Sequence, residues 1–396
     1  MAETQYPNTC ALDAFTALGE PLSTVLDMGT WRAGGDLATL YASLRQVVAE
    51  SIRQESACWA TFRQDVFSRL GHSTDRRAPK AQGVYRLTPD EVADVHHGIL
   101  FNGGTECCDG TLATHESLVL SVTQIGVSLV AYQGAEGTWV QRLYRRDLHT
   151  QHTDPVQEAL ALLERRALPD TDPHTGQSLS RLLARSLMEY AERAALVHFS
   201  TSRWRMGHGN PLPRTLLDFT PSDLTVAGIT ALRQLILEHR RFVYVASEPS
   251  NRLLLTLGHA LRPLEFAVVH TAGVQFVDQW LGLLDEDRRR PRAEIQRLTE
   301  FLHAVKDEIV VGVYRAGNQA PARVFYAHKD FACEAAAVAI ADSVLQLHRG
   351  FPMLIDLADQ VCRHTFDGGS FGASIQDAYA AAGEPLRYLG ERETRF

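Results

Sequence analysis

The chain has 396 residues, which at about 150 residues per domain corresponds to two or three domains, or to one core with large insertions. Hydrophobic residues make up 45% of it and charged residues 22%, which excludes wholesale disorder, collagen and a continuous coiled coil. There are 39 Lys and Arg against 47 Asp and Glu, a net charge of −8. This balance argues against a general basic surface for nucleic acid, although a local basic groove stays open.

No segment of the sequence has the character of a signal peptide or of a membrane span. The first residues lack a basic region and an apolar run, and the most apolar stretch, 118–132, is short and interrupted by polar residues. The 6 cysteines show neither zinc-site nor disulfide spacing, which favours free thiols in a reducing compartment. We therefore expect a cytoplasmic protein with no membrane partner.

The N-terminal part is predicted to be helical. Leu37, Leu40, Leu44, Val47 and Val48 recur at three- and four-residue steps, which is typical of an amphipathic helix. Residues 71–83 are polar and rich in helix breakers, so they are expected to form a loop. We predict an N-terminal helical segment over 1–95 and a second domain over 96–396.

The second domain is predicted to begin with an antiparallel meander and to continue as alternating helices and strands. The meander consists of a strand ending at Asp109, a β-branched run over 118–131 and a strand over 138–145. The pattern then predicts helices over 154–166, 178–198, 225–240 and 334–347, strands over 214–219 and 241–246, and a hairpin formed by 309–314 and 322–327. The fold class is therefore α/β, and a meander followed by α/β alternation is the layout of an RNase H-like core.

Acidic residues on these predicted core elements suggest a metal site. Asp109 ends the first strand and precedes Gly110, Glu189 and Glu192 lie on the long helix, and Asp218 ends a buried run. Carboxylates from two strands and a helix can converge on Mg²⁺ or Mn²⁺, and such ions can stabilise a phosphodiester displacement. The alternatives are ordinary ones: Asp-Gly often closes a turn, and glutamates on an amphipathic helix are often solvated.

Three segments, in this order along the chain, resemble the NurA nuclease family. Glu-Cys-Cys-Asp-Gly-Thr (106–111) resembles the family's strand ending in Val-Asp-Gly-Ser, whose Asp binds metal, and this implies that role for Asp109. The helix containing Glu192 resembles the helix with a metal-binding Glu, with Glu189 as the second choice. Arg-Thr-Leu-Leu-Asp-Phe (214–219) is similar to the strand ending in Leu-Asp-Gly-Ser, which implies that Asp218 is a ligand.

A fourth segment, 349–359, is similar to the family's Gly-Tyr-Pro-x-Pro-Leu-x-x-Ala-His but departs from it at two positions. Phe351 stands where the family has a catalytic Tyr, and Asp359 stands where it has a catalytic His. Phenylalanine has no hydroxyl, and a carboxylate cannot act as a neutral imidazole. Asp359 could instead add a fourth carboxylate to the metal cluster, and the alternative is that His364, five residues further on, takes the place of the family's His if the segment is helical.

Arginines supply the expected DNA contacts. Arg145 and Arg146 end the third strand. Arg203 and Arg205 flank Trp204, and an aromatic ring between two guanidinium groups could bind single-stranded DNA. The alternative is a loop anchored by a half-buried Trp204.

Two functions are compatible with these sequence features. The first is a Mn²⁺- or Mg²⁺-dependent deoxyribonuclease, for which the resemblance implies a homodimer working with a HerA-like hexameric translocase in DNA end processing, repair or anti-phage defence. The sequence has no Gly-x-x-x-x-Gly-Lys motif, so a motor would have to be a separate chain. The second is a catalytically weakened pseudo-nuclease that serves as an adaptor or DNA-channel subunit of the translocase.

Overall fold

The computed structural model describes residues 21–31, 37–70, 78–117, 120–133, 138–147, 156, 160, 179–218, 222–247, 251–287, 290–366 and 368–385. The chain divides into two compact units, residues 1–64 and 65–396. Among the described residues, no helix is long and apolar enough to cross a membrane.

The first unit contains the helix expected from the three- and four-residue spacing. α2 (Leu22–Leu26) is short, and α3 (Leu37–Phe62) is the long helix of this unit. The large apolar side chains of α3 are exposed, among them Leu40, Leu44 and Val47. The amphipathic pattern therefore forms the helix without burying its apolar face.

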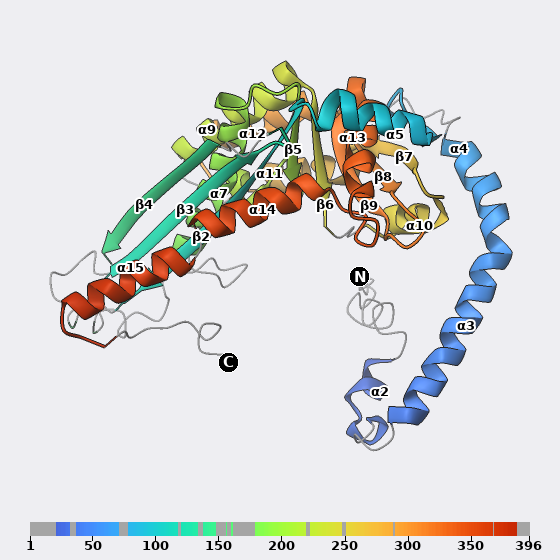
Figure 1. Ribbon diagram of the computed structural model, residues 1–396, viewed down its shortest axis with the longest axis horizontal. Helices are drawn as coiled ribbons and strands as arrows, with labels where there is room; N and C mark the ends of the chain where they lie inside the picture. Colours follow the sequence, from blue (N-terminus) through green and yellow to red (C-terminus); the bar gives the residue numbers. More distant parts are fainter. Residues whose placement is uncertain are drawn as a thin grey trace, which may run out of the picture. The chain divides into compact units, whose positions relative to one another are not determined.

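A mixed sheet organises the second unit (Figure 1). In the described part of the chain it has nine strands in the order β1-β7-β8-β9-β6-β5-β2-β3-β4. Their bounds are β1 Gly83–Arg86, β2 Thr105–Glu116, β3 Leu120–Val130, β4 Thr138–Asp147, β5 Trp204–His208, β6 Phe242–Ala246, β7 Glu265–Thr271, β8 Ile309–Arg315 and β9 Arg323–His328.

One half of this sheet has the predicted RNase H-like layout. β2, β3 and β4 form an antiparallel meander, and β5 and β6 then add parallel to β2 on its other side. The α/β fold class is confirmed. The other half extends the sheet by antiparallel pairing of β6 with β9, β9 with β8, β8 with β7 and β7 with β1, which includes the predicted hairpin of β8 and β9.

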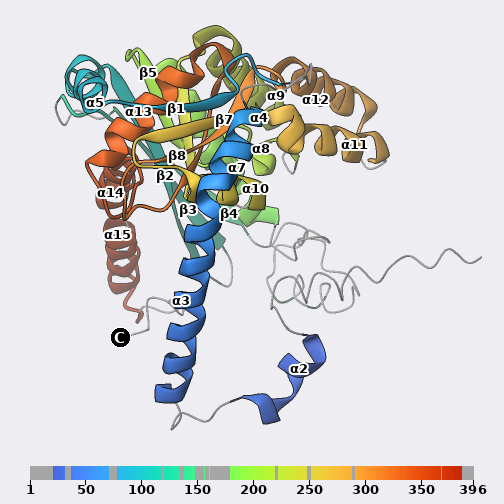
Figure 2. The same cartoon turned by 90° about the vertical axis from the view of Figure 1, so that its right-hand side faces the viewer.

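Helices cover both faces of the sheet, and each face has its own apolar core. α7 (Leu179–His198), α9 (Ser222–Arg233), α11 (Asp278–Glu286) and α12 (Arg292–Val305) contribute to one core. α5 (Pro89–Val95), α13 (Ala332–Val344) and α14 (Met353–Phe366) contribute to the other. α14 lies along β2 and β3, and α15 (Gly368–Ala381) continues from its end (Figure 2).

Two sequence predictions in this unit are wrong. The segment predicted as a strand over 214–219 is helix α8 (Arg214–Asp218), which begins directly after Pro213 and buries Leu216 and Leu217. A five-residue apolar run fits either a strand or one turn of helix, and a proline before it favours helix initiation. The segment interpreted as an arginine-flanked DNA loop is strand β5, in which Trp204 and Met206 alternate into the core.

Other elements follow the predictions or lie outside the described residues. α7, β3, β4, β6, α13 and the α9 region match the predicted segments. β1, β7 and α10 (Arg252–Ala260) were not predicted. Of the helix predicted over 154–166, the structure describes residues 156 and 160, both helical.

The predicted domain division at residue 95 differs from the boundary between the two compact units, which falls after residue 64. Residues 83–95 belong to the second unit because β1 pairs with β7 and α5 contacts α13.

Candidate active site

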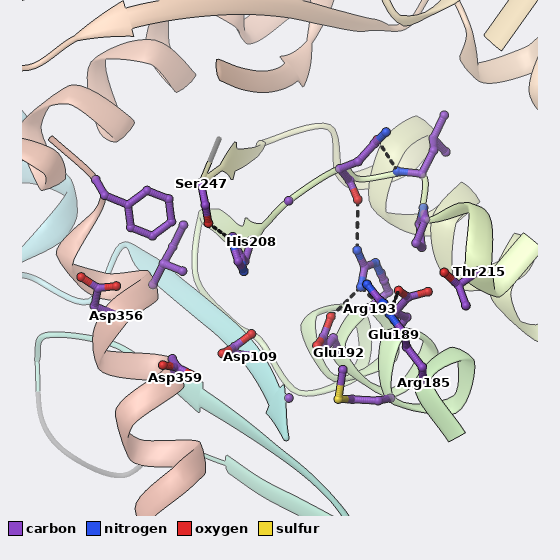
Figure 3. Close-up of a pocket in the computed structure, with 18 of the residues that line it drawn as sticks. Asp109, Arg185, Glu189, Glu192, Arg193, His208, Thr215, Ser247, Asp356 and Asp359 are labelled. Atoms are coloured by element: carbon purple, nitrogen blue, oxygen red, sulfur yellow. Dashed lines mark hydrogen bonds and ion pairs between the residues drawn. The ribbon is translucent and has the colours of Figure 1, made fainter. Parts of the chain in front are cut away.

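The site lies where β5 ends and β2 continues. The last parallel pair between these strands joins Cys108 to Gly207, so Asp109 and His208 are the next residues on each strand. Asp109 is in the interior of β2, not at its end as predicted, because β2 continues as a hairpin with β3. The end of β5 exposes this part of β2 and opens a pocket of about 610 Å³ (Figure 3).

Alternation along the strands places Asp109 and His208 on the same face. Cys107 lies in the core beneath α13 and α14, and Trp204 and Met206 lie in that same core. Since side chains two residues apart share a face, Asp109 follows Cys107 and His208 follows Met206 to the α14 side. His208 contacts Ser247, with 2.5 Å between its Nε2 and the Ser247 Oγ.

α14 brings Asp356 and Asp359 to this side of the pocket (Figure 3). Asp359 accepts a hydrogen bond from Arg363 Nε at 2.7 Å, one turn further along the helix. Asp356 accepts hydrogen bonds from Arg349 Nη1 at 2.5 Å and from Gln346 Nε2 at 2.7 Å. Phe351 is buried beside His208, with the two rings edge to face at 5.7 Å between centroids.

α7 brings Glu192 to the opposite side of the strand. A Cβ added to Gly110 would lie 2.7 Å from Met188 Cγ and 2.8 Å from Glu192 Oε1, so only glycine allows α7 to approach β2 this closely. Arg193 Nη1 donates to Glu192 Oε2 at 2.5 Å. Glu189, the second choice for the helix carboxylate, is engaged by Arg185 at 3.3 Å.

The surroundings of Asp109 oppose the ionisation of its carboxyl group. Burial is the largest cause that raises its pKa to about 8, and the charges of Glu192 and Asp359 act in the same direction. A side-chain hydrogen bond between Asp109 and Asp359 also raises it. Within the described ranges, Arg185, Arg193, Arg349 and Arg363 pair with the other pocket carboxylates, and no Lys or Arg pairs with Asp109.

Two of the pocket carboxylates also affect the pKa of His208. Partial loss of solvent lowers the pKa of its imidazole, while the charges of Asp359 and Asp356 oppose that shift. A neutral imidazole beside carboxylate oxygens is a donor set that divalent transition metals accept.

The donors fit a divalent cation chemically, but they do not enclose one. Asp109 and Asp359 are neighbouring, half-buried carboxylates, and such pairs bind either a proton or a cation. In the part of the chain that the structure describes, no group of three or more His, Cys, Asp or Glu side chains is arranged to hold a metal ion. Figure 3 shows Glu192 turned toward Arg193, with which it forms an ion pair.

Asp218 is the last residue of α8, and its side chain lies outside the described part of the structure, so its role as a metal ligand stays a prediction. His208, ten positions earlier in the sequence, stands at the end of the strand parallel to β2. The prediction that Asp218 ends a strand next to Asp109 is wrong because that strand is β5.

The predicted DNA contacts have different outcomes. Trp204 is 0% exposed, which contradicts stacking on a base. Arg203 is exposed, whereas Arg205 is half-buried and donates toward the Ser200 carbonyl. Arg145 and Arg146 lie on β4, and their side chains are outside the described part of the structure. Their contacts with DNA stay a prediction.

Sequence reasoning missed His208, Arg193 and Asp356. The alternation Trp-Arg-Met-Gly-His was the available signal for His208, since it predicts a short strand with its last residue at the sheet edge. Arg193 gave no sequence signal, because an arginine next to a glutamate on an amphipathic helix is usually solvated.

Comparison with known proteins gives structural likenesses only. No protein-family model and no curated protein matches the chain. A crystal structure of the NurA nuclease from Sulfolobus solfataricus aligns with a TM-score of 0.43 and 9% identity, covering 89% of this chain and 99% of that one. A NurA crystal structure bound to dAMP and manganese aligns with a TM-score of 0.41 and 7% identity, covering 81% and 92%. With TM-scores below 0.5, no residue role is transferred from these structures.

Proposed function

We propose that the chain is a deoxyribonuclease whose divalent cation, Mn²⁺ or Mg²⁺, is held by Asp109 and Asp359, with Glu192 and His208 beside it. The observation that carries the proposal is the pairing of two half-buried carboxylates, Asp109 and Asp359, in which no described cationic side chain compensates Asp109. A cation at this position would relieve the repulsion that raises the pKa of Asp109. When bound, it would stabilise the negative charge that develops on a phosphodiester under attack by water.

The other pocket residues bind and orient the substrate. Arg185 and Arg214 line the cavity on the α7 and α8 side, and guanidinium groups bind phosphate oxygens through paired hydrogen bonds. Ser247 fixes the ring of His208, which can hold or transfer a proton at the leaving oxygen. Phe351 is buried against that ring and limits its rotation, a positioning role that needs no hydroxyl.

Cleavage of linear double-stranded and single-stranded DNA in Mn²⁺ tests this proposal. Wild type is expected to cleave, chelation of the metal is expected to stop cleavage, and Asp109→Asn is expected to lose at least about 100-fold in rate, as removal of one strong electrostatic contact does in other active sites. Asp94→Asn, on the exposed surface of α5, is the matched control. Cleavage by Asp109→Asn at the wild-type rate would refute the site, and a wild type that binds DNA without cleaving it would favour the adaptor function.

The proposal extends to the partners that the sequence resemblance implies. A HerA-like hexameric translocase would deliver DNA to this pocket, and two copies of the chain would form the homodimer on which it docks. Co-purification with such an ATPase, and a molecular mass of twice the chain in solution, are the expected results. Repair and anti-phage defence are distinguished by the phenotype of a deletion strain, which would be sensitive to DNA damage or to phage.

A further inference from the structure

Arg193 is fixed at the centre of the pocket by contacts with three different segments. Its side chain is 4% exposed. Nη1 donates to Glu192 Oε2 at 2.5 Å and to the Glu189 carbonyl at 3.1 Å, and Nη2 donates to the Asn210 carbonyl at 3.1 Å. The guanidinium also lies 5.5 Å from the centroid of the Tyr244 ring. A buried guanidinium held from several directions cannot swing away when another cation approaches.

The pocket carboxylates are divided between the two faces of β2. Glu192 reaches Gly110 from α7, where Arg193 compensates its charge. Asp109 shares the α14 side with Asp359, as the strand alternation shows. Arg363, which pairs with Asp359, has 67% of its side chain exposed and can move into solvent. The α7 side therefore already has a permanent cation, and the α14 side does not.

We infer that Arg193 takes the place of one cation in this pocket, so that the chain binds a single divalent ion, on the Asp109–Asp359 side, and not a pair. The inference rests on the proposed function. A second divalent ion near Glu192 would have to compete with a guanidinium that lies within hydrogen-bond distance of the same carboxylate. Repulsion between the two cations, with little water between them, opposes that second ion.

The number of Mn²⁺ ions bound by the full chain tests the inference. Metal-free wild type is titrated with MnCl₂ by isothermal calorimetry, and free Mn²⁺ is counted independently by electron paramagnetic resonance. The expected result is one ion per chain, lost in Asp109→Asn. Two ions per chain would overturn the inference and leave the proposed function intact. If no ion binds, or if Asp109→Asn binds as wild type does, the proposed metal site itself fails.

Variants at Arg193 test whether this side chain is the cause. Arg193→Gln is expected to bind two Mn²⁺ ions, because Glu192 loses its partner, whereas Arg193→Lys keeps the charge and is expected to bind one. Arg53→Gln is the control: Arg53 also pairs with a glutamate, Glu50, but lies on α3 and does not line the pocket, so this variant is expected to bind one ion. Circular dichroism establishes that each variant is folded. A folded Arg193→Gln that still binds one ion would overturn the role of Arg193, and if that variant does not fold, the wild-type count decides.

Discussion

Single residues decide how closely the catalytic elements approach, and Gly110 is the most constrained of those at the pocket. Gly110→Ala is expected to destabilise the protein by about 1–3 kcal/mol, because the added methyl overlaps Met188 and Glu192 and α7 must shift. DNA cleavage in Mn²⁺ is expected to fall with it, since Glu192 is displaced from Asp109. Thermal unfolding and the cleavage rate measure the two effects.

Gly282→Ala is the control for that substitution. Gly282 lies in helix α11 with no atom within 4 Å of an added Cβ, so alanine is expected to stabilise the protein by up to about 1 kcal/mol and to leave cleavage unchanged. Equal melting temperatures and equal rates for Gly110→Ala and wild type would show that α7 is not held against β2 at Gly110.

At the residue scale, the sequence predicted part of the pocket. Asp109, Glu192 and Asp359 all line it, and each was suggested by its place on a predicted core element or by a motif. Asp218 was chosen as the last residue of a strand, but the segment that it ends is helix α8. His208 could not be predicted as a site residue while β5 was interpreted as a loop. Arg193 could not be predicted either, because its role depends on the contacts of α7, which the sequence does not give.

Between elements, one buried carboxylate connects three segments of the α14 face. Asp342, near the end of α13, accepts hydrogen bonds from the Tyr132 hydroxyl after β3 and from the Leu354 N–H at 2.9 Å, at the start of α14. Burial raises the pKa of Asp342 to about 7, although both hydrogen bonds act to lower it. The start of the helix that carries Asp359 is thus attached to a group that titrates near neutrality.

This attachment predicts a pH dependence of stability. An unfolded Asp has a pKa of about 3.9, so the folded state binds the Asp342 proton more tightly. The stabilisation is complete below about pH 4 and is lost as the pH rises toward 7. Asp342→Asn, which carries no titrating proton, is expected to remove this part of the pH dependence. Denaturant unfolding between pH 4 and 8 measures it, and parallel curves for the two proteins would contradict the prediction.

The elements that sequence reasoning found and missed differ in length and in periodicity. α7, β3 and β4 have 20, 11 and 10 residues, long enough for their pattern to separate helix from strand. β5 and α8 have five residues each, and in so short a segment an apolar pair fits either structure. β1 and β7 pair with each other across 179 to 185 positions, and no local signal in the sequence predicts such a pairing.

Across the whole molecule, charge sets a condition on DNA binding. The chain has a net charge of −8, and the described lining of the pocket holds five carboxylates and five arginines. Four of these arginines are already paired with carboxylates, so they offer little positive charge to an incoming phosphate. A DNA-binding protein of this composition needs positive charge at the pocket itself, and a divalent cation supplies it.

We therefore expect the affinity for DNA to depend on the metal. At constant ionic strength, adding Mn²⁺ in place of EDTA is expected to tighten binding of a non-cleavable phosphorothioate oligonucleotide by at least about tenfold, or about 1.4 kcal/mol. Asp109→Asn separates the cause from general screening: without metal, the raised pKa of Asp109 keeps most of this carboxyl group protonated at neutral pH, so in EDTA the variant should bind DNA about as tightly as wild type, and it should gain little from Mn²⁺. Fluorescence anisotropy measures both proteins. If Mn²⁺ tightens binding equally for the two, the ion acts outside the pocket, and the acidic surface as a whole, not Asp109, controls access of DNA.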